Sequence, residues 1–194
     1  MSGVVSNYFG RMVPNGHLAE CIEFLEDGLR CLKPTLYHQV LGKDFLAHTD
    51  DLGTWIADFW KKCADADVRL AALYLEMNGF TINPGHWHCD VFGHKTSGDV
   101  WDLEWLEEWD AEHRECFVLT GMEDVQDAYA KLFTEDEQPL GVQLAEEITE
   151  HLVTARFMQL VAAAHEAAKA IDPAMARVKV FATAHDWDNV HMTE

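Results

Sequence analysis

The spacing of apolar residues changes along the chain, and this change restricts the possible folds more than any other feature of the sequence. In three segments apolar residues recur every three or four positions, as they do on one face of a helix. This spacing predicts helices over residues 17–32, 51–63 and 141–171. Elsewhere apolar and polar residues alternate, as they do along a strand with one covered face. The chain therefore contains both helices and a sheet.

Four segments are predicted to be strands, namely residues 68–77, 80–92, 116–119 and 177–184. Asn78 and Gly79 separate the first two strands and favour a tight hairpin turn, because both residues tolerate a positive φ. A capping box that begins at Thr120 predicts a further helix after the third strand. Helices, then strands, then a helix before the last strand indicate an α+β fold, with a small antiparallel or mixed sheet flanked by helices.

The length of 194 residues is typical of one domain. We expect a single domain over residues 1–194. Its N-terminal part, residues 1–66, is predicted to be helical, and residues 67–194 are predicted to form the sheet and its flanking helices.

Acidic side chains outnumber basic ones by 34 to 14, which gives a formal net charge of −20. This charge repels nucleic-acid phosphates and anionic membrane surfaces, so we expect neither as a partner. No run of about 18 apolar residues predicts a membrane span, and the first residues lack the pattern of a signal peptide. The five cysteines are scattered and form no CxxC pair, which argues against a disulfide framework. We therefore expect a cytoplasmic protein with reduced thiols.

The most distinctive segment combines acidic residues with tryptophans. Residues 99–137 hold fourteen acids against two bases, and three tryptophans at helical spacing lie among them. We expect a helix here, and a stripe buried in the core is one interpretation of the tryptophans. Repulsion between so many like charges favours the other interpretation, in which a cationic partner relieves it. The predicted binding residues for a basic protein partner are Trp101, Glu104, Trp105, Glu107, Glu108 and Trp109.

A second cluster of polar residues lies on the second predicted strand. His86, His88 and Asp90 alternate along the chain, so a strand projects all three from one face. Imidazole and carboxylate groups are suitable ligands for zinc or iron, and His185 or Asp186 after the last strand could complete the set. The alternative interpretation is a solvent-facing side of the strand that binds no cofactor, with the residues after the last strand forming a solvated tail. We adopt this second interpretation.

From Val68 onward the predicted elements follow a particular order. An Ala-Leu-Tyr strand, an Asn-Gly-Phe turn, a Trp-rich insert, a capped helix, a long helix and a Val-Lys-Val-Phe strand with an acidic tail follow one another. This order resembles uncharacterised bacterial α+β domains found beside toxin-immunity genes. The resemblance covers residues 68–194 and carries no catalytic residue with it.

Two functional hypotheses follow from the sequence. The first is an acidic, non-enzymatic interaction protein that binds a basic protein, as an immunity-type inhibitor or a mimic of nucleic-acid charge. The alternative is a small metal-dependent hydrolase or oxygenase that uses the histidine-rich strand. Nucleotide-binding glycine loops, hydrolase elbows and zincin motifs are absent from the sequence.

Overall fold

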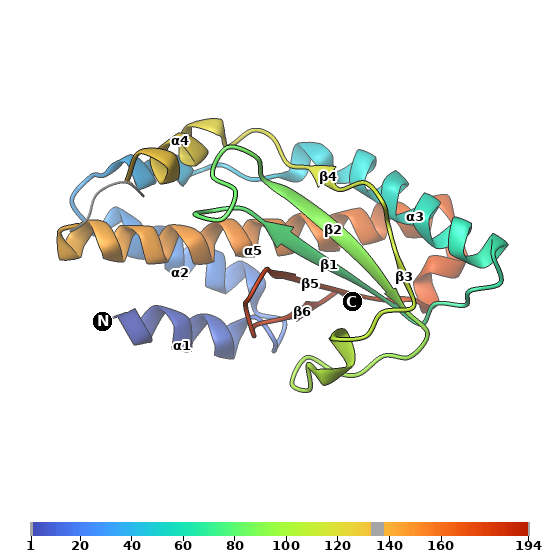
Figure 1. Cartoon of the computed structure of the whole chain (residues 1–194). Coiled ribbons are helices and arrows are strands. Elements are labelled where there is room, and N and C mark those ends of the chain that lie inside the picture. Colours follow the sequence, from blue (N-terminus) through green and yellow to red (C-terminus); the bar gives the residue numbers. More distant parts are fainter. Residues whose placement is uncertain (1, 133–137, 194) are drawn as a thin grey trace.

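The structure, a computed structural model, describes residues 2–132 and 138–193 and has an α+β fold, as the sequence predicts (Figure 1). The helices are α1 (Ser2–Met12), α2 (Leu18–Arg30), α3 (Thr49–Asp65), α4 (Glu123–Leu132) and α5 (Leu140–Ile171), with short 3-10 helices η1 (Leu36–Val40), η2 (Leu46–His48), η3 (Glu104–Leu106) and η4 (Pro173–Arg177). The strands are β1 (Ala72–Asn78), β2 (His88–His94), β3 (Ala111–Glu112), β4 (Phe117–Val118), β5 (Lys179–Ala184) and β6 (His191–Met192). Residues 133–137, part of the acidic stretch noted above, lie outside the described residues.

The strands form one mixed sheet in the order β3-β2-β1-β5-β6, and β4 pairs with the same edge of β2 as β3. β1 and β5 run parallel, while every other described pair is antiparallel. In this register Glu76 of β1 lies between Asp90 of β2 and Thr183 of β5. The centre of the sheet is therefore built from strands near the middle and near the end of the chain.

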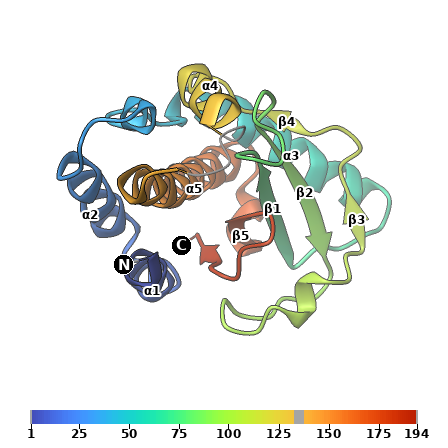
Figure 2. The same cartoon turned by 60° about the vertical axis from the view of Figure 1, so that its left-hand side comes forward.

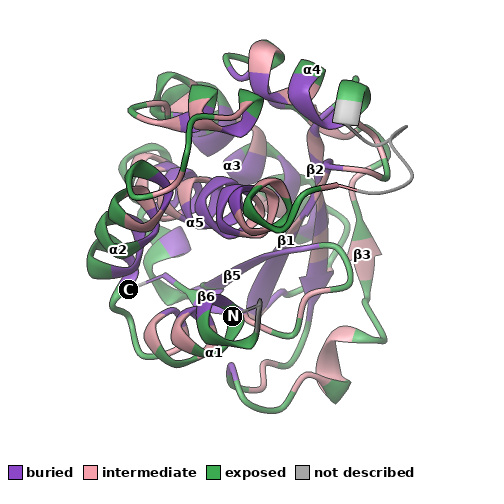
Figure 3. Cartoon of the chain, turned by 90° about the vertical axis from the view of Figure 1, so that its left-hand side faces the viewer, coloured by how far each residue is buried: buried purple, intermediate pink, exposed green. Residues whose placement is uncertain are grey.

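Helix α5 lies at the centre of the molecule, with α1, α2 and α3 packed around it and the sheet on a further side (Figure 2). It is buried along most of its length, on more than one side (Figure 3). A helix that is apolar nearly all round belongs in the interior. Within the described residues, no helix combines the length and apolar character needed to span a membrane.

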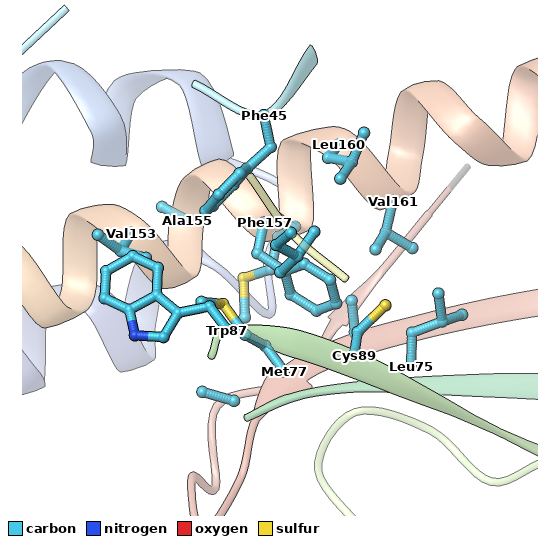
Figure 4. Packing of buried hydrophobic residues seen from close by; sticks show 14 of the residues in the cluster. Phe45, Leu75, Met77, Trp87, Cys89, Val153, Ala155, Phe157, Leu160 and Val161 are labelled. Atoms are coloured by element: carbon cyan, nitrogen blue, oxygen red, sulfur yellow. The ribbon is translucent and has the colours of Figure 1, made fainter. Parts of the chain in front are cut away.

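The inner face of the sheet packs on α5. Leu75 and Met77 of β1 and Cys89 of β2 lie beneath Phe157 and Val161 of the helix (Figure 4). Successive strand residues point to opposite faces, so this alternation also selects which residues face outward. Cys89 is fully buried, in agreement with the alternation predicted from the sequence.

Gly53 allows α3 to approach α5 closely. A Cβ atom at this position would lie 2.8 Å from the Cβ of Ala167 and 2.9 Å from the carbonyl oxygen of Ala164. A backbone atom is one of these neighbours, so no side-chain rotation on α5 alone makes room for a larger residue. The glycine therefore fixes the distance between the two helices.

The predicted two-residue turn between β1 and β2 is wrong, although the two strands do pair antiparallel. β1 ends at Asn78 and β2 begins only at His88, so most of the predicted strand 80–92 before His88 is a loop. The loop buries Phe80 and Trp87, whose ring centroids lie 5.5 Å apart. Burial of two aromatic rings outweighs the turn preference of the Asn-Gly pair.

The sequence does not predict β6, and it predicts α1 only as part of a helical N-terminal region without bounds of its own. β6 pairs with β5, and Thr193 just beyond it is buried, with its hydroxyl 2.5 Å from Nδ1 of His165 on α5. The segment after the last predicted strand is therefore not a solvated tail throughout. It returns to the sheet and ties the end of the chain to the central helix.

Candidate functional site

The outer face of the sheet, opposite α5, has two different halves. Tyr74 belongs to a small apolar cluster with Ala72 and Phe181, and residues 98–110 cover it. Glu76 and Asn78, farther along β1, form hydrogen bonds with other polar side chains instead. We call the covering segment, residues 98–110, the Trp-acid loop. We call the part of the outer face around Glu76 and Asn78 the polar half.

Trp105 fastens the Trp-acid loop to the sheet. Its ring centroid lies 4.9 Å from that of Phe181 and 4.9 Å from that of His94, in edge-to-face contacts. Its indole N–H donates to the carbonyl oxygen of Asp99 at 3.3 Å. Gly98 is adjacent, and any Cβ at that position would overlap the indole ring. Trp105 is therefore a structural residue of the loop, half-buried against the sheet.

The helix predicted for this segment is wrong, because only the short η3 (Glu104–Leu106) forms. The Asp99 carboxylate accepts hydrogen bonds from the backbone N–H of Trp101 at 2.7 Å and of Asp102 at 3.1 Å. Aspartate side chains that bind nearby backbone N–H groups favour turns over helix. As a result the three tryptophans do not share one buried stripe.

The loop exposes two of its tryptophans. Trp101 is 65% exposed and Trp109 is 48% exposed, with the Trp109 ring resting against Phe92 at 4.9 Å between centroids. The carboxylates of Glu104, Glu107 and Glu108 are also exposed, and among the described residues none of them forms a hydrogen bond or ion pair. The predicted binding residues other than Trp105 are thus exposed at the surface.

Trp101 lies at the edge of a groove of about 770 Å³. Its apolar wall comes from α2, α5 and β6, through Leu18, Ile22, Ala162, Ala163 and Met192. The groove places an apolar cavity directly beside an acidic loop.

In the polar half, two carboxylates lie on adjacent strands. Glu76 accepts from the Tyr74 hydroxyl at 2.9 Å and lies 2.7 Å from Nδ1 of His185. The hydrogen bond to Glu76 raises the pKa of His185. Asp90 accepts from the side-chain amide of Asn78 at 3.2 Å, and partial burial raises the pKa of its carboxyl. Because β5 neighbours β1 and not β2, His185 meets Glu76 and does not join the histidines before and on β2.

The structure brings together two of the three predicted metal ligands and replaces the third. Potential ligand atoms of His86, His88 and Cys116 all lie within 4.8 Å of one another, and Asp90 is not part of this group. The β2–β4 register pairs His88 with Val118, so continuing it places Cys116 across from Asp90. The Asp90 carboxylate accepts a hydrogen bond from Asn78 on the other neighbouring strand.

A third group of titratable residues lies on α5. Glu150 lines a hollow of about 330 Å³ together with Glu147, His151 and Asp188. Burial, with a smaller contribution from neighbouring Glu146 and Glu147, raises the pKa of Glu150 to about 7.

Comparison of the chain with protein-family models, with curated proteins and with solved structures finds no match.

Proposed function

We propose that this chain is an acidic, non-enzymatic interaction protein that binds a basic protein partner through the Trp-acid loop. The observation that carries the proposal is the 65% exposure of Trp101 on a loop held in place by Trp105. Tryptophan is among the residues that contribute most to protein interfaces, because it buries a large rigid surface on contact. A partner that covers Trp101 and Trp109 gains this contribution with little loss of loop entropy.

The charges of the loop fit a cationic partner. Asp99 and Asp110 are used internally, with Asp110 bound to the backbone N–H of Lys95 at 2.8 Å and to its ammonium group at 2.9 Å. The three exposed glutamates remain for external contacts. Exposed charges of one sign steer an oppositely charged partner and raise the association rate.

The groove beside Trp101 suggests the kind of segment that binds. A basic segment that carries an apolar side chain would place its charges along the glutamates and insert that side chain between Ile22 and Met192. We infer an immunity-type inhibitor or a mimic of nucleic-acid charge that acts in the cytoplasm. Nucleic acids and membranes are not partners in this proposal.

The test begins with affinity capture from the source cell, quantified by mass spectrometry. The wild-type chain is compared with a Trp101→Ala, Trp109→Ala double variant. The partner is a basic protein that the wild-type chain enriches and the double variant does not. In kinetic binding measurements, Trp101→Ala should raise the dissociation rate roughly tenfold or more, because the anchor is lost.

A charge variant separates steering from anchoring. Replacing Glu104, Glu107 and Glu108 with glutamine should lower the association rate at low salt roughly tenfold and flatten its dependence on salt. The matched control, Glu23→Gln with Asp51→Asn and Asp58→Asn on α2 and α3, removes the same number of exposed charges elsewhere. Equal effects of the two triple variants would mean that only net charge matters and would contradict a specific role for the loop.

A further inference from the structure

We propose that His86, His88 and Cys116 form a binding site for one zinc ion. The three residues come from the loop before β2, from β2 itself and from the position just before β4. Two of them are neighbours in sequence and the third is brought to them by the pairing of β2 with β4. The site lies on the polar half of the sheet and is independent of the Trp-acid loop.

The spacing of the ligand atoms is close to what zinc requires. They lie within 4.8 Å of one another, whereas bond lengths of about 2.0 to 2.3 Å in a tetrahedral site hold ligand atoms roughly 3.3 to 3.6 Å apart. Closing the difference needs shifts of about 1 Å. His86 is exposed and belongs to a loop, so rotation of its side chain supplies much of this shift. His88 and Cys116 are half-buried and already held by the strand pair.

A hydrogen bond orients His88 for this role. Its Nδ1 lies 3.2 Å from the carbonyl oxygen of His86, which accepts but cannot donate. In the neutral imidazole the proton is therefore on Nδ1, and Nε2 keeps its lone pair for a metal. Fixing one ring nitrogen through a backbone carbonyl is a common way in which proteins orient a metal-binding histidine.

The surrounding charge favours a cation. An oxygen of Asp90 lies 3.7 Å from Nε2 of His88, so a carboxylate and a lone pair face the same space. A cation close to both relieves their repulsion. Asp90 thus contributes to the field at the site without being one of the three clustered ligand residues.

The donor atoms select the class of metal. Two imidazoles and a thiolate suit zinc, whereas magnesium and calcium prefer oxygen ligands. Three protein ligands leave the fourth tetrahedral position for water, as in catalytic zinc sites and unlike closed structural ones. Zinc binding requires Cys116 as the thiolate and releases its proton.

The test uses Co²⁺ as a spectroscopic probe for zinc. The full chain, reduced and freed of metal by a chelator, should bind one Co²⁺ with a thiolate charge-transfer band and tetrahedral visible bands that added Zn²⁺ removes. Cys116→Ser should abolish the charge-transfer band and weaken Zn²⁺ binding at least tenfold in calorimetry. Cys31→Ser is the matched control, since Cys31 is an exposed free thiol after α2, and it should change neither signal.

Two further variants keep the proposal falsifiable. His86→Ala alters an exposed loop side chain, so it should keep the fold, as circular dichroism can check, and still lose at least tenfold in Zn²⁺ affinity. Asp90→Asn should retain the charge-transfer band and the one-to-one stoichiometry. A charge-transfer band that survives in Cys116→Ser, or Zn²⁺ affinity unchanged in His86→Ala, would overturn the site. Neither result would affect the proposed partner binding, which uses other residues.

Discussion

Glu150 shows how burial makes the stability of this protein depend on pH. Its carboxyl lies on the central helix near Glu146 and Glu147, and burial raises its pKa to about 7. The hydroxyls of Tyr37 and Tyr129 lie near these carboxylates, and burial together with the acidic neighbours raises the pKa of both. Between the ordinary pKa of a glutamate and pH 7, the folded state keeps a proton that the unfolded state has lost. The free energy of unfolding therefore falls as pH rises through this range.

We predict that Glu150→Gln stabilises the fold at pH 8 by about 1 to 3 kcal/mol, because it removes a buried charge that is present only at high pH. At pH 4 the gain should be small, since the wild-type carboxyl is then protonated in the folded state and mostly protonated in the unfolded state. Urea unfolding at the two pH values measures the difference. Glu23→Gln on the exposed side of α2 is the control and should show no such pH dependence. A Glu150→Gln variant that is less stable than wild type at pH 8 would contradict the prediction.

Single residues were predictable where strand alternation alone decides their environment. The burial of Cys89 was predicted for this reason. The place of Cys116 beside His86 and His88 was not predicted, because it depends on the pairing of β2 with β4, which no local pattern encodes. The environment of Glu150 was missed for a similar reason, because acids in a helix normally indicate its solvent-exposed side.

At the scale of elements, periodicity located α2, α3 and α5 to within a few residues. It failed where short polar side chains or aromatic burial compete with the regular structure. Aspartate-capped turns replaced the helix expected around Trp105, and the burial of Phe80 and Trp87 replaced the tight turn after Asn78. Of the three tryptophans, Trp105 packs into the apolar cluster on the sheet, whereas Trp109 rests against Phe92 and stays half-exposed.

The contact between α3 and α5 gives a prediction at this scale. Gly53→Ala should destabilise the fold by about 1 to 3 kcal/mol, because the added methyl overlaps Ala167 and the backbone of Ala164. Its better helix propensity, about 1 kcal/mol, offsets only part of this cost. Chemical denaturation measures the change. Gly141→Ala in the first turn of α5 meets no atom within 4 Å and should be neutral or slightly stabilising. Equal effects at the two sites would show that α3 adjusts freely.

For the whole molecule, the α+β class was predictable but the strand order was not. The class follows from the kinds of elements and their order along the chain. The order β3-β2-β1-β5-β6 depends on which strand pairs with the free edge of β1. That strand is β5, which lies about 100 residues farther along the chain. The antiparallel β1–β2 pair was predictable because the two strands follow each other closely in the sequence. No local pattern indicates that β1 and β5 are parallel neighbours.

This arrangement predicts that the chain needs β5 to fold. A version that ends at residue 177 lacks β5 and β6, and it exposes one edge of β1 together with part of α5. It should lose its near-ultraviolet circular dichroism signal and become sensitive to protease. A version that ends at residue 184 keeps β5 and should remain folded with reduced stability. A native-like spectrum from the shorter version would contradict the prediction.

The pairing of β1 with β5 also affects how the protein is made. During synthesis β1 emerges from the ribosome long before its parallel neighbour, which is still untranslated. Helix α5 emerges in between, after the helices α1, α2 and α3 that pack around it but before the strand that completes the centre of the sheet. Until β5 is synthesised, one edge of β1 and the side of α5 that faces the sheet lack their cover, so the nascent chain is exposed to non-native contacts during this interval.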